Sequence, residues 1–306
     1  MYKKILYPIK FEEFSLDLLR CILDFKSVGT EEIVFVHVID VSKLPMDKYE
    51  GYSTRDVESL KAIAEEKMKE AIRIAEEAGL RTKKTIRVGV PYREILNVSR
   101  EESGISLIVS GRQKKSTLKE IFIGSNTDRI IRYGDIPVFI PKYPAAFGAS
   151  KEECERVCKN LFKRLLYPTD WSDCAKITLQ YLKGLKGAGV EEVVVAHVMD
   201  EKAMKFQPLE RFKEFEKQDL ERLDEVKKEL EQSGFKVKTR LEIGRPGSDL
   251  IRIAREEDIT MIIMGTHGKG YVEGILWGSV SRNVVEYSDK PVLLIKSERC
   301  LKEVRI

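Results

Sequence analysis

Glycines and serines gather in one stretch near the end of the chain, MGTHGKGYVEGILWGSVSRN (264–283). Gly265 and Gly268 follow an apolar run typical of a strand, and Gly278 precedes Ser279 at the start of a helix-like segment. Glycine lets the backbone approach a ligand closely, and the N–H groups at the start of a helix attract anions. The stretch therefore predicts a phosphate-binding site.

A carboxylate, Asp170, follows a second apolar run, LLYP (165–168). In a doubly wound sheet, ligands bind beyond the carboxyl ends of the strands, so we expect Asp170 to lie across the same crevice as the glycines. A carboxylate does not suit phosphate, but it suits a ribose hydroxyl or an exocyclic amine. A sugar or base at one end and phosphate at the other describe a nucleotide.

Two common phosphate-binding motifs are excluded by their spacing. A Walker loop needs Gly-x-x-x-x-Gly-Lys, but Gly270 is followed by Tyr271. A dinucleotide fingerprint follows the first strand of its unit, whereas Gly268-x-Gly270 follows the fourth. For any single glycine, a role in shaping a turn is the alternative interpretation. The set of glycines, together with Asp170 and the hydroxyls of Ser279 and Ser281, favours ligand binding.

The chain contains the same unit twice. EEIVFVHVID (31–40) matches EEVVVAHVMD (191–200), and GDIPVFIP (134–141) matches SDKPVLLI (288–295), in the same order along the chain. This indicates a domain duplication. We expect domains at 1–143 and 161–306, joined by a linker at 144–160 that is rich in small residues.

Each half alternates short β-branched runs with helical periodicity, which predicts two tandem doubly wound α/β domains, each with a parallel sheet and helices on both faces. In the second half we expect strands near 163–168, 191–198, 236–242, 259–264 and 291–295, and helices near 172–186, 208–233, 247–257 and 279–288. The core face of the longest helix should carry Phe212, Phe215, Leu223, Val226 and Leu230. The last strands of the two halves, PVFI and PVLLI, would otherwise leave open edges, so we expect the halves to form a pseudo-two-fold pair within the chain.

The second half resembles the universal stress protein family. Its spacing Gly265-x2-Gly268-x9-Gly278-Ser279 looks like the nucleotide-binding signature of that family, and YPTD, AHV, GRP, MGTHG and GSVSRNVV fit the same pattern. The resemblance covers nearly the whole chain. It implies a five-stranded sheet of order 3-2-1-4-5 in each half, edge-to-edge pairing of the last strands of the halves, and a bound ATP or AMP. We expect Mg or Mn to aid the binding of ATP.

The resemblance also implies the contacts of the ligand. Asp170 belongs near adenine or ribose, with Pro168 and Thr169 beside it, and Val198 offers backbone contacts to the base. The residues along the ribose and phosphates are Met264, Gly265, His267 and Gly268, and those that cradle the phosphates are Gly278, Ser279, Val280 and Ser281.

The first half departs from this pattern. Lys10 stands at the position of Asp170, Gln113 and Lys114 stand at those of His267 and Gly268, and only Gly124 and Ser125 remain. A bulky cation then lies where the backbone must approach the ligand, and the base-side carboxylate is gone. We expect one nucleotide per chain, in the second half, with no more than a lone phosphate at Gly124, Ser125 and Thr127 of the first.

No catalytic constellation can be assembled from the motifs, because Asp170 is their only carboxylate. We therefore expect a nucleotide-binding regulatory protein with slow or negligible hydrolysis. The alternatives are an ATP hydrolase or nucleotidyl transferase, whose H-x-G-H and S-G-G-x-D-S motifs do not occur, and a ligand-free interaction protein. His37 and His197 end equivalent strands and are expected to be structural, while Trp171 and Trp277 flank the crevice and are expected to pack.

Composition narrows the class of partner. The 306 residues include 54 Lys and Arg against 50 Asp and Glu, and the charges alternate along helix-like segments, which indicates solvated faces rather than a nucleic-acid-binding stripe. No run approaches the roughly 20 apolar residues of a membrane span. We expect a cytoplasmic protein whose five cysteines are free thiols, which forms a homodimer and has a protein partner that the sequence does not identify.

Overall fold

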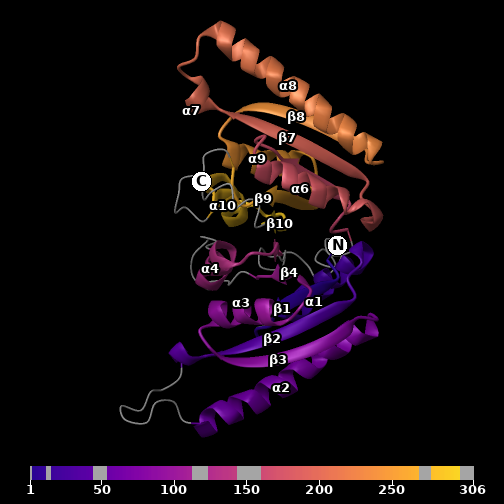
Figure 1. Ribbon diagram of the computed structural model, residues 1–306, viewed down its shortest axis with the longest axis vertical. Helices are drawn as coiled ribbons and strands as arrows, with labels where there is room; N and C mark the ends of the chain where they lie inside the picture. The colour runs from indigo at the N-terminus through magenta and orange to yellow at the C-terminus, as the bar shows by residue number, and fades with distance from the viewer. Residues whose placement is uncertain are drawn as a thin grey trace.

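The chain forms two α/β halves that meet edge to edge in the computed structural model shown in Figure 1. The structure describes residues 2–11, 15–43, 54–111, 123–142, 160–268 and 277–296. The elements of the first half are β1 (Lys4–Pro8), α1 (Ser15–Leu23), β2 (Glu32–Asp40), α2 (Thr54–Glu77), β3 (Arg81–Gly89), α3 (Pro91–Glu101), β4 (Ile105–Val109), α4 (Ser125–Tyr133) and β5 (Val138–Ile140), with 3-10 turns η1 (Asp24–Val28) and η2 (Val41–Lys43).

The second half repeats this succession. Its elements are β6 (Arg164–Pro168), α6 (Asp173–Lys183), η4 (Lys186–Ala188), β7 (Glu192–Asp200), α7 (Glu201–Met204), α8 (Leu209–Gln232), β8 (Val237–Gly244), α9 (Pro246–Glu256), β9 (Met261–Gly265), α10 (Ser279–Tyr287) and β10 (Val292–Ile295). The predicted strands and long helices are confirmed, and their ends lie within three residues of the predicted positions. The short helix α7 was not predicted. Among the described helices, none is both long and apolar enough to cross a membrane.

One ten-stranded sheet runs through the protein in the order β3-β2-β1-β4-β5-β10-β9-β6-β7-β8. Each half therefore has the predicted order 3-2-1-4-5, with parallel pairing inside each half. The halves meet where β5 pairs antiparallel with β10 and Phe139 lies opposite Leu293. This confirms the predicted pairing of the last strands. It also places α2 and α8 at opposite ends of the molecule (Figure 1).

Alternate strand residues face two hydrophobic clusters, one on each side of the sheet. In β1, Ile5 and Tyr7 belong to one cluster and Leu6 to the other. The first cluster packs against α1, α2, α6 and α8, and the second against α3, α4, α9 and α10. Both clusters contain residues of both halves, so the core extends across the junction.

Two buried lysines cap helices across that junction. Lys142, after β5, donates to the carbonyl of Val285 in α10, and Lys296, after β10, donates to the carbonyls of Ile131 (2.7 Å) and Arg132 (2.9 Å) in α4. Each cation therefore meets the last turn of a helix, whose carbonyl groups lack donors within the helix. Burial lowers the pKa of Lys296 from 10.5 to about 8, although Asp135 opposes part of this shift. Each half thus caps a helix of the other half with a buried lysine.

The cysteines correct one expectation. Cys174 is a buried free thiol, but Cys21 in α1 is disulfide-bonded. The prediction of five free thiols is therefore wrong for Cys21. A disulfide needs Cα atoms about 4.4–6.8 Å apart, and tertiary packing rather than spacing along the chain decides whether two cysteines meet that condition.

Candidate functional site

The predicted residues of the second half gather at one edge of the sheet. Since β6 lies between β9 and β7, the loop after β6, the loop after β9 and the start of α10 meet where the strand order reverses. The backbone N–H of Thr169 donates to Ala196 in β7 (2.9 Å), and that of Thr266 donates to Ile295 in β10 (3.2 Å). These bonds fasten both loops to the end of the sheet.

Asp170 lies against the glycine loop. Its Oδ1 accepts hydrogen bonds from the backbone N–H (3.1 Å) and the hydroxyl (2.6 Å) of Ser172, an Asx turn that starts α6. Its Oδ2 faces Gly268, where an added Cβ would lie 2.1 Å from this oxygen. A side chain at position 268 would therefore displace the carboxylate. The predicted base-side acid and the predicted glycine loop are direct neighbours.

The start of α10 is arranged as an anion site. No side chain caps the helix after Gly278, and its first turn contains no acidic residue. The first N–H groups of a helix have no acceptor within the helix. The hydroxyl of Ser281, however, donates to the carbonyls of Thr266 (2.9 Å) and Gly278 (3.0 Å). Ser281 therefore offers a ligand its backbone rather than its hydroxyl, whereas the side chain of Ser279 is exposed.

Several of the other predicted residues present mainly backbone to this edge. The side chains of Val198 and Met264 are buried in the hydrophobic cluster that packs against α9 and α10. Val280 packs against the same cluster from the first turn of α10. Pro168 and Gly265 are the last residues of β6 and β9. Contacts from these five residues to a ligand would therefore be made largely by main-chain atoms.

The side chains of Thr169 and His267 already have partners. The Thr169 hydroxyl accepts a hydrogen bond from the backbone N–H of Trp171 (3.2 Å). His267 is 8% exposed, and its Nδ1 lies 3.0 Å from the Thr266 hydroxyl oxygen. His267 is therefore held inside the loop by its neighbour rather than extended into solvent.

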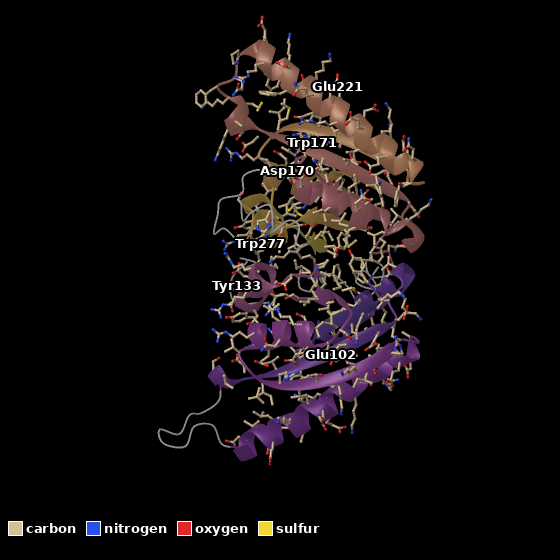
Figure 2. The ribbon with its side chains drawn as sticks, viewed as in Figure 1. Glu102, Tyr133, Asp170, Trp171, Glu221 and Trp277 are labelled. Atoms are coloured by element: carbon tan, nitrogen blue, oxygen red, sulfur yellow. The ribbon has the colours of Figure 1, made fainter. Side chains whose placement is uncertain are left out.

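The two tryptophans differ in their surroundings. Trp277 is 3% exposed and belongs to the cluster beside α10, which confirms the predicted packing. Trp171 has a φ of 65°, a left-handed conformation that bulky residues rarely adopt. Its indole N–H donates to Asp219 of α8 (2.8 Å). Figure 2 shows Trp171 and Asp170 together beside the strands of the second half.

Asp219 is a residue of this region that the sequence interpretation missed. It lies midway between Phe215 and Leu223 on the core face of α8 and is 9% exposed. Besides Trp171, it contacts His197, whose Nε2 lies 3.2 Å from Asp219 Oδ2. A carboxylate inside an otherwise apolar stripe was the available signal, since buried charges require partners.

Both strand histidines have the structural role that was predicted for them. His197 Nδ1 lies 2.7 Å from the carbonyl oxygen of Thr169, and His37 Nδ1 lies 3.0 Å from that of Ile9. Each ring therefore fastens the loop that follows the first strand of its half.

The equivalent edge of the first half has different charges. Lys10, at the position of Asp170, is exposed, and Gln113 and Lys114 lie outside the described residues. The helix α4 also starts without a side-chain cap, but Asp128 stands in its first turn. A carboxylate there already occupies the positive end of the helix dipole.

In the predicted lone-phosphate site of the first half, one of the two hydroxyls, that of Thr127, is engaged by protein atoms. Gly124 is the N-cap of α4, and Ser125 is exposed. The hydroxyl of Thr127 donates to the carbonyl of Gly111 (2.9 Å) and accepts from Ser110 (2.9 Å). Thr127, which stands at the position of Ser281, thus also uses its hydroxyl for a hydrogen bond to a loop carbonyl.

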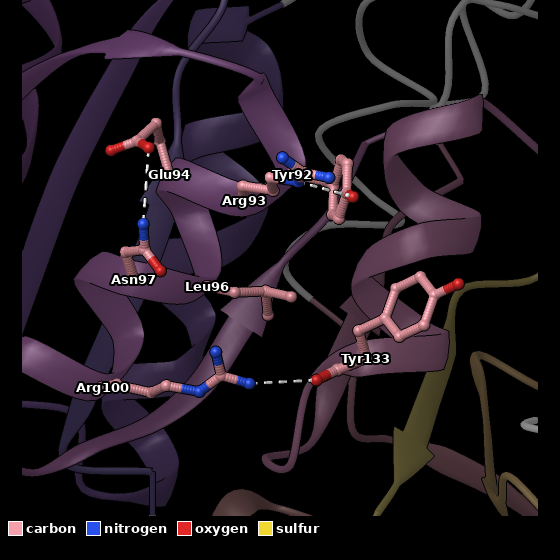
Figure 3. A pocket seen from close by; sticks show the side chains of 7 residues that line it. All are labelled: Tyr92, Arg93, Glu94, Leu96, Asn97, Arg100 and Tyr133. Carbon is pink, nitrogen blue, oxygen red and sulfur yellow. Dashed lines mark hydrogen bonds between the residues drawn. The ribbon is translucent and has the colours of Figure 1, made fainter.

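The first half also contains a pocket of about 270 Å³ between α3 and α4 (Figure 3). Tyr92 is the second residue of α3, and the second residue of α9 is Gly247, where an added Cβ would lie 2.6 Å from Asn283 Oδ1 of α10. In the first half, Arg129 takes the place of Asn283, with its guanidinium 4.9 Å from the centre of the Tyr92 ring. The pocket is lined by Tyr92, Arg93, Glu94, Leu96, Asn97, Arg100 and Tyr133, none of which was predicted as a site residue.

Metal-ligating side chains do not converge in the part of the chain that the structure describes. No three His, Cys, Asp or Glu residues there are grouped so that they could hold a metal ion.

Known proteins resemble the chain over most of its length. The model of the Universal stress protein family matches residues 1–142 and 161–296. Universal stress protein MJ0577 of Methanocaldococcus jannaschii is 39% identical over 155 residues, which cover 44% of this chain and 96% of that protein. The crystal structure of a universal stress protein from Archaeoglobus fulgidus covers 97% of this chain and 99% of its own, at 28% identity and a TM-score of 0.74.

A more distant structure supports the fold alone. The putative universal stress protein from Pseudomonas aeruginosa is 15% identical, with a TM-score of 0.63, and covers 99% of this chain and 96% of its own. The family model thus matches each copy of the internal repeat, and a solved relative spans both copies together. The chain belongs to the universal stress protein family, as a tandem-domain member.

Proposed function

We propose that the second half binds an adenine nucleotide, ATP or AMP, as the regulatory ligand of a stress-response protein. The observation that carries this proposal is the placing of Asp170 and an uncapped helix N-terminus at one switch point of the sheet. The first group suits hydroxyl or amine donors, and the second suits phosphate. A nucleotide has both kinds of group.

The residues divide between the two ends of such a ligand. Asp170 accepts a hydrogen bond from a ribose hydroxyl or the adenine amine, with Pro168 and Thr169 beside it, and the backbone of Val198 contacts the base. Met264, Gly265, His267 and Gly268 run along the ribose and phosphates. Backbone N–H groups at Ser279, Val280 and Ser281, after Gly278, hold the phosphates together with the Ser279 hydroxyl.

Two further observations fit a ligand with phosphates. Arg282 stands in the first turn of α10 and adds a positive charge beside the helix N-terminus. The indole N–H of Trp277 is buried next to Gly278 and has no acceptor among the described residues. A buried donor without an acceptor is costly, and an oxygen of a ligand would satisfy it.

We expect Mg²⁺ or Mn²⁺ to bind with ATP rather than before it, because Mg²⁺ is commonly held by phosphates with few protein ligands. Hydrolysis should be slow, because it needs a positioned water and stabilisation of the charge that develops in the transition state. The first turn of α10 supplies no carboxylate for the first task. Turnover is therefore expected well below the roughly 10 s⁻¹ median of enzymes.

Calorimetric titration with ATP and with AMP tests the proposal. We expect a stoichiometry near one nucleotide per chain. The absence of binding by both nucleotides would favour a ligand-free interaction protein, and phosphate release near the enzyme median would favour an ATP hydrolase. Analytical ultracentrifugation with and without nucleotide tests the homodimer, which stays a proposal.

A further inference from the structure

The apolar face of α8 is interrupted by one buried carboxylate, Asp219, and both of its oxygens have partners. Oδ1 accepts from the indole N–H of Trp171 (2.8 Å) and lies 3.5 Å from Nη1 of Arg222. Oδ2 lies 3.2 Å from Nε2 of His197. The guanidinium of Arg222 also lies 5.8 Å from the centre of the Trp171 ring. One side chain therefore joins a helix, a strand and the loop after β6.

The hydrogen bonds of His197 fix its role in this cluster. Its Nδ1 is 2.7 Å from the carbonyl oxygen of Thr169, which can only accept, so Nδ1 carries a hydrogen. Its Nε2 lies 3.2 Å from Asp219 Oδ2, within the distance of an ion pair. Through this ring, Asp219 is therefore in contact with the residue that holds the Thr169 carbonyl.

Asp219 thus reaches the residues on both sides of Asp170. It holds Trp171 directly, and it holds Thr169 through His197. The loop needs such support, because the left-handed backbone of Trp171 (φ 65°) is strained for a bulky residue. Without the bond to the indole, we expect the residue to relax toward an ordinary conformation and to carry Asp170 with it.

The first half provides a natural comparison, since α2 and α8 both contain 24 residues. The eleventh residue is Asp219 in α8 and the buried Ala64 in α2. Phe11 replaces Trp171 and has no donor, and Lys67 lies 5.4 Å from its ring centre. Burial, and secondarily the charge of Lys67, lower the pKa of His37, and Ala64 stands where Asp219 faces His197.

We propose that Asp219 is a positioning residue, which holds the loop from Thr169 to Trp171 so that the Asp170 carboxylate faces the nucleotide base or ribose. This inference rests on the proposed function of the second half. The half that has Lys10 in place of the base-side carboxylate also lacks the residue that would position it.

The test uses full-length protein, with AMP binding measured in the otherwise wild-type chain. Asp219→Ala is expected to raise the Kd for AMP by about tenfold or more, comparable to the loss of an outer-shell partner at a metal site. In a Trp277→Phe background, which leaves Trp171 as the sole tryptophan of the chain, Asp219→Ala should also increase the quenching of Trp171 emission by acrylamide. Ala64 shows that the fold accepts alanine at this place.

Asp219→Asn distinguishes positioning from charge. The amide oxygen can accept from the Trp171 indole and the amide N–H can donate to Nε2 of His197, so both readouts should stay close to those of the parent. Asp224→Ala removes an exposed carboxylate of the same helix and should change neither readout.

Unchanged AMP affinity and unchanged quenching in Asp219→Ala would overturn the inference, and so would an Asn variant as impaired as the Ala variant. If the wild-type protein binds no AMP, the proposed function fails. The quenching data then still decide whether Asp219 holds the loop, because they need no ligand.

Discussion

The two halves share one strand order and one set of covering helices, yet they differ at both ends of the ligand site proposed for the second half. Lys10 replaces Asp170, Ala64 replaces Asp219, and Asp128 replaces Arg282. The first and third changes reverse the charge at each end of the site. The second removes the support of the base-side loop.

This comparison separates what makes the fold from what makes the site. Buried strands such as β1 and β6 have the same alternation of core residues in both halves. The differing residues stand in loops, in first helical turns or at one helix face, where a substitution need not disturb the sheet. A half can therefore lose its ligand chemistry and keep its place in the structure.

The largest expected effect comes from giving the second half the lysine of the first. Gly268→Lys should abolish detectable binding of ATP and AMP, because even its Cβ would lie 2.1 Å from Asp170 Oδ2. Gly187→Lys is the matched control, since a Cβ there meets nothing within 4 Å. Calorimetry measures both variants. Normal binding by Gly268→Lys would show that Lys114 is not what distinguishes the first half.

Lys296 tests a feature that the two halves share, the buried lysine at their junction. Its folded pKa of about 8 lies below 10.5, so between these values the unfolded chain holds more protons and stability rises with pH. The contribution is fully present above pH 10.5 and is lost as the pH falls through about 8. In urea unfolding, the free energy of unfolding of the wild type should rise by about 2–3 kcal/mol relative to that of Lys296→Met between pH 7 and 10.

The exposed Lys213 gives the control for that measurement, because Lys213→Met should leave the difference from wild type constant with pH. A constant difference for Lys296→Met as well would mean that the Lys296 amine keeps its solvent in the folded protein.

A smaller effect is expected where α9 packs against α10, a contact that differs from that of α3 with α4 in the first half. Gly247→Tyr should destabilise the protein by about 1–3 kcal/mol, because α9 and α10 must part to admit the ring. Adding Asn283→Arg recreates the pair of Tyr92 and Arg129 and should recover about 0.5–1 kcal/mol. Urea unfolding of the single and double variants measures both terms. If Gly247→Tyr leaves the free energy of unfolding unchanged, Tyr92 does not explain why a pocket separates α3 from α4 in the first half.

The smallest effect concerns the phosphate end. Arg282→Asp introduces the carboxylate that α4 has at Asp128, and it should weaken ATP binding by about 0.3–1 kcal/mol, roughly two- to fivefold in Kd. The loss should be greater for ATP than for AMP and should shrink at high salt. Calorimetric titrations at two ionic strengths measure it. An equal loss for both nucleotides would place Arg282 away from the outer phosphates.

The strands could be predicted from local periodicity and the two domains from the repetition, whereas the order of the sheet and the edge-to-edge pairing of the halves followed from the resemblance to the universal stress protein family. The sequence predicted less about side chains. The hydroxyl of Ser281 was assigned to a ligand from its place after Gly278, but its bond to Thr266 depends on how two loops meet. Asp219 was visible as an acid between Phe215 and Leu223, yet its partners come from residues far away in the chain.

The pairing of β5 with β10 has a consequence for synthesis of the chain on the ribosome. The β5 edge is complete some 150 residues before β10 is made, which at about 5–20 residues per second leaves it unpaired for about 10–30 s. Its length of three residues limits what can bind there meanwhile. The β10 strand of a second copy of the chain can pair with this β5 edge in the same way. Synthesis of several chains close together would therefore favour domain-swapped oligomers. Refolding at rising protein concentration, followed by size-exclusion chromatography, would reveal them.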